Sequence, residues 1–141
     1  MKKSKLVIAC ICLLFVAFAS CKKKHNPSAQ DNIVGKWKIT EEATDLNGNG
    51  VMDANEIHID TSLSNIIVTF NANGTAITSL SGLPYYSFLW ALTNNSTYLK
   101  TTDTSSGGAI QFLHIDNLTS SSMTLKDTTG GTVGWEVWTK Q

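Results

Sequence analysis

The sequence contains no arginine, and this absence limits the kinds of partner that the protein can have. Eleven lysines balance eleven carboxylates over the whole chain, but six of the lysines precede residue 31. From Asp31 onward, five lysines face eleven carboxylates, which gives a formal net charge of −6. Nucleic-acid binding depends on clustered basic residues. An acidic segment without arginine therefore argues against a nucleic-acid partner.

Cysteine is also scarce, and two of the three cysteines lie in an unusual N-terminal segment. Cys10 and Cys12 fall within Leu6–Phe18, an apolar run of thirteen residues that follows a lysine-rich start. This run is shorter than the ~20 residues that a membrane-spanning helix needs. We therefore interpret residues 1–20 as a secretory signal peptide. Its removal would leave Cys21 as the only cysteine, so an internal disulfide is excluded.

The end of the apolar segment points to a lipid anchor. Phe18-Ala19-Ser20-Cys21 resembles the lipobox of bacterial lipoproteins, in which the cysteine is acylated and becomes the new N-terminus. Phe18 departs from the usual leucine but is large and apolar. Acyl chains on Cys21 would hold the protein on a membrane, and polar residues 21–30 would form a tether. The resemblance implies an exported protein of a bacterial cell envelope, at the outer membrane. The alternative is ordinary cleavage after Ser20, which leaves a free thiol.

Residues 31–141 have the composition of one small all-β domain. The segment lacks any ten-residue stretch of helical periodicity, and runs rich in Thr, Ile, Val and aromatic residues alternate with Asn, Gly, Asp and Ser. Short connections between successive strands favour an antiparallel meander, and closure into a barrel pairs every strand on both sides. We expect eight to nine short strands and a barrel of about eight, within residues 33–42, 57–60, 65–70, 75–80, 85–92, 97–102, 109–115, 122–126 and 132–140.

Several short sequences in this domain resemble bacterial lipocalin-like lipoprotein domains. Gly35-Lys36-Trp37 is similar to the Gly-x-Trp signature of lipocalins, and TFNANGT, FLWALTNNSTYLKT, IQFLHIDNLTSSSMTLKD and GWEVWTK follow in the same order. The resemblance covers about residues 33 to 140. It implies a lipocalin-like barrel in which Trp37 packs across the closed end.

Aromatic residues are candidates for the wall of a ligand pocket. Trp90 lies on a predicted strand, and Tyr85 and Tyr86 follow a proline at a predicted barrel mouth. Trp135 and Trp138 are three residues apart, so they should face opposite sides of a strand. Two interpretations are open. The aromatic residues could line a pocket for a small apolar ligand, or they could fill the core of a small barrel.

The segment DLNGNGVMDANE, residues 45–56, matches the spacing of a calcium-binding loop. Calcium prefers six to eight oxygen ligands, and the twelve-residue EF-hand loop supplies them from positions 1, 3, 5, 7, 9 and 12, with glycine at position 6. Gly50 occupies position 6. The ligands would be Asp45, Asn47, Asn49, the carbonyl of Val51, Asp53 and Glu56.

The flanks of this loop are predicted strands, which differs from an EF-hand and indicates a structural Ca²⁺ rather than a calcium sensor. The alternative is a solvated Asn-Gly-rich loop. Affinity should lie in the range of exported modules, roughly 10⁻⁴ to 10⁻³ M.

Catalytic residues are not apparent in the sequence. The chain has three histidines, His25, His58 and His114, which are far apart in sequence. No arrangement of nucleophile and base emerges from them. We therefore predict a lipid-anchored, non-enzymatic, lipocalin-like envelope protein with a calcium loop, which binds a small apolar ligand or another envelope protein. The alternative is an interaction module whose barrel is filled by its own side chains.

Overall fold

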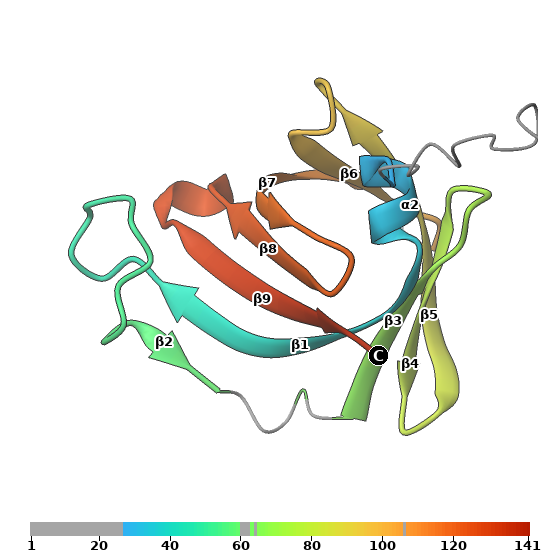
Figure 1. Cartoon of the computed structure of the whole chain (residues 1–141), viewed down its shortest axis with the longest axis horizontal. Helices are drawn as coiled ribbons and strands as arrows, with labels where there is room; N and C mark the ends of the chain where they lie inside the picture. Colours follow the sequence, from blue (N-terminus) through green and yellow to red (C-terminus); the bar gives the residue numbers. More distant parts are fainter. Residues whose placement is uncertain (1–26, 60–62, 64, 106) are drawn as a thin grey trace, which may run out of the picture.

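The computed structural model describes residues 27–59, 63, 65–105 and 107–141, and this part of the chain is almost entirely β-structure (Figure 1). The predicted signal peptide, Cys21 and the first part of the predicted tether lie outside the described residues. The elements are α2 (Ala29–Ile33), β1 (Gly35–Thr44), β2 (Ile57–His58), β3 (Ile66–Phe70), β4 (Thr75–Leu80), β5 (Leu83–Thr93), β6 (Tyr98–Asp103), β7 (Ile110–Leu118), β8 (Ser122–Asp127), the short 3-10 helix η2 (Thr129–Gly131) and β9 (Gly134–Lys140).

Eight of the strands form a closed antiparallel barrel. Strands β3 to β9 pair in chain order, β1 pairs with β3, and β1 also pairs with β9 to close the cylinder. The two-residue strand β2 pairs with the last part of β1, outside the cycle of eight. The predicted all-β meander barrel of about eight strands is thus confirmed.

A short helix precedes the barrel, where the sequence analysis placed the end of a tether. The hydroxyl of Ser28 accepts a hydrogen bond from the Asp31 backbone N–H, and the Asp31 carboxylate accepts one from the Ser28 backbone N–H. This reciprocal pair is a capping box, which stabilises the first turn of a helix. This helix includes Ala29 and Gln30, the last two residues of the predicted tether 21–30, and the first strand starts at Gly35 instead of Ile33. Among the described residues, no helix is long and apolar enough to cross a membrane.

The Gly-x-Trp sequence lies at the end of the barrel that α2 covers. Trp37 is fully buried, and its indole N–H donates a 2.7 Å hydrogen bond to the carbonyl of Ile33, itself buried in the core. The Lys140 ammonium lies 5.2 Å from the centre of the Trp37 ring and donates to the Asn32 carbonyl at 2.8 Å. Gly35 has φ of 136°, and a Cβ there would lie 2.5 Å from the Lys140 side chain. This end of the barrel is therefore closed by packed side chains.

Candidate functional site

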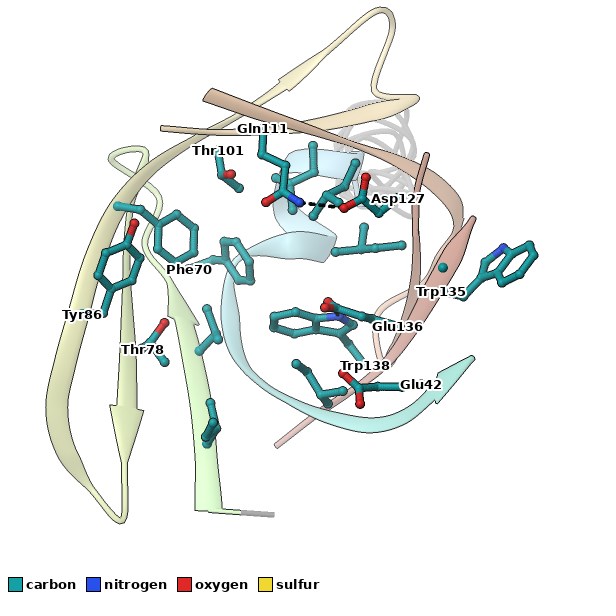
Figure 2. Close-up of a pocket in the computed structure, with 18 of the residues that line it drawn as sticks. Glu42, Phe70, Thr78, Tyr86, Thr101, Gln111, Asp127, Trp135, Glu136 and Trp138 are labelled. Carbon is teal, nitrogen blue, oxygen red and sulfur yellow. Dashed lines mark hydrogen bonds between the residues drawn. The ribbon is translucent and has the colours of Figure 1, made fainter. Parts of the chain in front are cut away.

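A cavity of about 690 Å³ lies inside the barrel, where β1, β6 and β8 end and β3, β7 and β9 begin (Figure 2). It shares its apolar floor with the core: Val68, Phe70, Leu99, Leu125 and Trp138. Ligand pockets usually have volumes of ~300 to 1,000 Å³ and predominantly apolar walls. The cavity is therefore large enough to hold a small organic molecule.

An unbroken row of aromatic rings forms one wall of this cavity. Trp138 lies beside Phe70, with ring centres 6.2 Å apart, and Phe70 meets Phe88 edge-on at 6.1 Å. Phe88 in turn stacks with Tyr86 at 5.9 Å. All four residues line the cavity. Such a wall offers flat apolar surface over a length that a ring system or an alkyl chain could follow.

The rest of the lining carries negative charge. Four carboxylates border the cavity: Glu42, Asp103, Asp127 and Glu136. No lysine occurs among the described residues that line it, and the one basic side chain there is His58. The His58 Nε2 atom lies 3.7 Å from Glu42, and the side chain is 57% exposed. The cavity thus combines an apolar floor with an acidic mouth.

A β-bulge directs Glu42 into the barrel. Ile39 pairs with Trp138 and Glu42 with Glu136, so the four residues from Ile39 to Glu42 face only three on β9. Thr40 is the extra residue, and its hydroxyl donates to the Val137 carbonyl at 3.1 Å. Side chains alternate between the two faces of a strand, and one inserted residue reverses that alternation. Without the bulge, Glu42 would face outward.

Two carboxylates consequently face the same interior space from adjacent strands. Glu42 and Glu136 are direct cross-strand partners, and both project into the barrel (Figure 2). Burial raises the pKa of Glu136, and the negative charges of Glu42 and Asp127 raise it further. A 2.9 Å hydrogen bond from the Trp138 indole to Glu136 opposes these effects in part. Like charges directly opposite each other destabilise a sheet, so this pair is held against its own repulsion.

The other two carboxylates are better accommodated. Burial acts to raise the pKa of Asp127, but hydrogen bonds from Thr129, Gln111 and the local backbone outweigh it and lower that pKa. On the opposite side, burial, the hydrogen bond with Asp103 and its negative charge raise the pKa of Tyr86. Tyr86 therefore remains a protonated hydroxyl that can donate a hydrogen bond.

Only one of the three aromatic residues predicted to line a pocket does so. Tyr86 borders the cavity, whereas Tyr85 is 76% exposed because a bulge at the start of β5 turns it outward. Trp90 is buried in the core, and its indole N–H donates to the carbonyls of Asn71 and Thr75 at 3.1 and 3.0 Å. Sequence reasoning assigned no role to the four carboxylates of the cavity.

The predicted calcium loop joins β1 to β2 and is folded around its own acidic side chains. The carboxylate of Asp45 accepts hydrogen bonds of 2.7 to 3.2 Å from the backbone N–H groups of residues 48, 49 and 50. Glu56 is 4% exposed and accepts bonds of 2.9 to 3.3 Å from the N–H groups of residues 46, 47 and 53. The two ends of the loop are thus tied to the same small region.

The amide residues of the loop turn toward the same region. Asn47 and Asn49 each donate a 2.9 Å hydrogen bond from the side-chain amide to one oxygen of Asp53. Gly50 has φ of 72°, which permits the sharp turn there, and the backbone N–H of Val51 donates to Asn49. Among the described residues, no group of three His, Cys, Asp or Glu side chains is placed to hold a metal ion. Along the loop, the amide residues Asn47 and Asn49 stand between the carboxylates of Asp45 and Asp53.

The loop is packed against the outside of the barrel. Trp135 points away from the interior, opposite to Trp138 as the spacing predicted (Figure 2). Its indole N–H donates to Asp116 at 3.0 Å, and the Lys126 ammonium lies 5.0 Å from its ring centre. Lys126 also donates a 2.9 Å hydrogen bond to the carbonyl of Gly50. The loop therefore rests on β8 and β9, the strands that carry Asp127 and Glu136 on their inner faces.

Comparison with known proteins places this barrel among lipocalin-like folds. The model of the family described as "Lipocalin-like domain" matches residues 33–125. The crystal structure of a lipocalin-like protein from Bacteroides uniformis ATCC 8492 is similar, with a TM-score of 0.54 and 12% sequence identity. The match covers 78% of this chain and 99% of that chain, and at this identity it concerns the fold alone. A search of curated proteins found no match.

Removal of the Glu136 charge should stabilise the fold by an amount that grows with pH. Because burial raises the pKa of Glu136 in the folded state, the unfolded chain loses its proton at a lower pH than the native protein does. Stability therefore falls as pH rises from the unfolded pKa through the folded one. We expect Glu136→Gln to raise the midpoint of urea denaturation clearly at pH 7 and by less at pH 4.

Glu41→Gln is the matched control, since Glu41 pairs with Val137 beside this site and does not line the cavity. It removes the same charge, and its effect should stay within about 0.5 kcal/mol at both pH values. Equal effects of the two substitutions, or a Glu136→Gln gain that is largest at pH 4, would contradict the assignment of Glu136 as a strained interior carboxylate.

Proposed function

The chain belongs to the family of lipocalin-like domains, and we propose that it is a non-enzymatic protein that binds a small, largely apolar ligand inside its barrel. The observation that carries this proposal is the cavity of about 690 Å³ above the core. A barrel with a purely structural role can fill its interior with side chains, as small barrels often do. Here the aromatic wall borders open space, which favours ligand binding over a filled barrel.

A protein partner is the second candidate, supported by exposed apolar side chains beside the turn that joins β4 and β5. Leu80 and Leu83 pair with each other across this turn, and both are exposed, as is Tyr85. Neighbouring exposed apolar residues are typical of interaction surfaces. This candidate becomes the preferred one if the cavity takes no ligand.

Binding in the cavity can be tested with N-phenyl-1-naphthylamine, a neutral apolar dye whose fluorescence rises in apolar surroundings. We expect saturable binding to the purified protein. Thr101 lines the cavity, so Thr101→Trp should fill part of it and weaken binding at least about tenfold.

Thr102→Trp is the control, because the next residue of a strand faces the other side. This variant should bind the dye as the wild type does. No binding to the wild type, or equal loss in both variants, would contradict a ligand site inside the barrel.

We further propose that residues 45–56 bind a structural Ca²⁺ through Asp45, Asn47, Asn49, the Val51 carbonyl, Asp53 and Glu56. The complete sequence register supports it, together with the hydrogen bonds that bring the side chains of Asn47 and Asn49 to Asp53. The loop also carries three carboxylates, Asp45, Asp53 and Glu56, and no lysine among the described residues is ion-paired with them. A divalent cation would compensate this charge and fix the connection between β1 and β2.

Calcium should therefore raise the thermal stability of the protein. A cation at about a hundred times its dissociation constant, bound to the folded state only, adds about 2.7 kcal/mol. We expect Asp45→Ala and Glu56→Ala to abolish the calcium-dependent rise in melting temperature, and Glu41→Ala, outside the loop, to retain it. Melting curves that respond neither to Ca²⁺ nor to a chelator would contradict the calcium proposal.

We also propose that acylation of Cys21 anchors the protein to a bacterial outer membrane. The support is the sequence Phe18-Ala19-Ser20-Cys21 after a short apolar segment. Cys21→Ala should move the protein from the membrane fraction to the soluble fraction and abolish incorporation of labelled palmitate. Cys10→Ala and Cys12→Ala, within the apolar segment, should leave both unchanged. Continued membrane fractionation of Cys21→Ala would count against the anchor.

A further inference from the structure

We propose that the cavity selects a ligand that carries a positively charged amino group on an apolar body. This inference rests on the proposed function, because it names the chemical class of the ligand that the barrel binds. The volume of the cavity and its aromatic row point to an organic ligand without any reference to charge. The carboxylates at the mouth then determine the sign of the charge that such a ligand should bear.

The cavity has a clear excess of negative charge. Of its four carboxylates, Asp127 is held ionised by its hydrogen bonds, and the basic group at the rim, His58, is more than half exposed. The nearby lysines are used elsewhere: Lys126 lies on Trp135 outside the barrel, and Lys140 lies on Trp37 at the closed end. A cleft lined by one sign of charge concentrates ligands of the opposite sign. A carboxylate ligand would meet repulsion here.

The pair of Glu42 and Glu136 is the part of this lining that most needs a cation. The two side chains face each other across neighbouring strands, and the protein gives Glu136 a single side-chain donor among the described residues, the Trp138 indole. Asp127, by contrast, accepts from both Thr129 and Gln111. An ammonium group has three N–H donors and no acceptor. One such group could therefore donate to both glutamates and remove their mutual repulsion.

The position of this pair relative to the aromatic row gives the ligand an orientation. Trp138 is the first ring of the row and touches Glu136 through its hydrogen bond. An amino group at the glutamates would thus leave its apolar body against Trp138 and Phe70, with Phe88 and Tyr86 further along. A cation next to an indole ring gains additional electrostatic attraction. The charged end of the ligand would therefore meet the two glutamates, and its apolar body would meet the aromatic rings beside them.

A divalent metal ion is the rival occupant of the carboxylate pair. Calcium takes six to eight oxygen ligands, whereas the pair supplies only two carboxylates, Glu42 and Glu136. A metal at this place would also leave the aromatic row without a role. The observations therefore favour the amine.

The test compares three competitors that share one apolar body and differ in charge. Purified protein is loaded with N-phenyl-1-naphthylamine at pH 7, and the dye is displaced with 2-(1-naphthyl)ethylamine, 2-(1-naphthyl)ethanol or 1-naphthylacetate. We expect the ammonium compound to displace the dye at a concentration about tenfold lower than the alcohol, and the carboxylate to be the weakest competitor. The double variant Glu42→Gln/Glu136→Gln should bind the dye and lose this preference. Glu41→Gln, the single-charge control for Glu136→Gln at a position that does not line the cavity, should keep it.

The possible results separate the two claims. If neither the dye nor any competitor binds to the wild type, the proposed function itself fails. If the dye binds but the three competitors are equal, or if the double variant keeps the preference, the amine inference is wrong and the ligand site stands. Loss of the preference in millimolar Ca²⁺ or Mg²⁺ at constant ionic strength would identify the pair as a metal site and overturn the inference. Dye binding by the double variant also shows that it is folded, and Glu136→Gln alone should show an intermediate preference.

Discussion

The pairing of β1 with β9 is the constraint on which the rest of the structure depends. This ladder closes the cylinder, because it joins the first long strand of the meander to the last. Three cross-strand pairs of this ladder lie in three different parts of the molecule. Ile39 pairs with Trp138 at the floor of the cavity, and Glu42 pairs with Glu136 at its mouth. Ala43 pairs with Trp135 on the outer side of the barrel. Because Thr40 is inserted between them, Ile39 in the lower half of the barrel and Glu42 in the upper half both face the interior. Without that insertion the mouth would lose half of its acidic pair.

The interior of the barrel is a compromise between stability and binding. Its lower half follows the ordinary logic of a core: Ile33, Trp37 and Met123 are fully buried, and the buried indole N–H groups find acceptors. Its upper half differs from a core, because Glu136 is a buried carboxylate beside a second carboxylate, Glu42, and burial disfavours its charged form. Departures of this kind from local consistency tend to occur at functional sites, where stability is given up for recognition. The location of the strain, at the mouth of a cavity, fits this pattern.

The strand content could be predicted from the sequence, whereas the direction of several side chains could not. Alternating apolar residues and Asn-Gly or Gly-rich turns identified the strands because period-two patterning and turn chemistry are local properties. The bulges at Thr40 and at the start of β5 are not local, since they depend on the register of a partner strand. For this reason the inward direction of Glu42 was overlooked, and Tyr85 was predicted to line a pocket that it does not border. The capping pair at Ser28 was visible in the sequence and was missed because the segment lacks helical periodicity.

The small strand β2 has a consequence for the behaviour of the protein in a crowded environment. Beyond Trp37, β1 parts from β3, and its unpaired backbone groups would offer a template to a strand of another molecule. Ile57 and His58 pair with Ala43 and Glu42 on that side and occupy part of this edge. Loosening of the polar loop that leads to β2 would therefore uncover this part of the β1 edge and leave it open to pairing with another molecule.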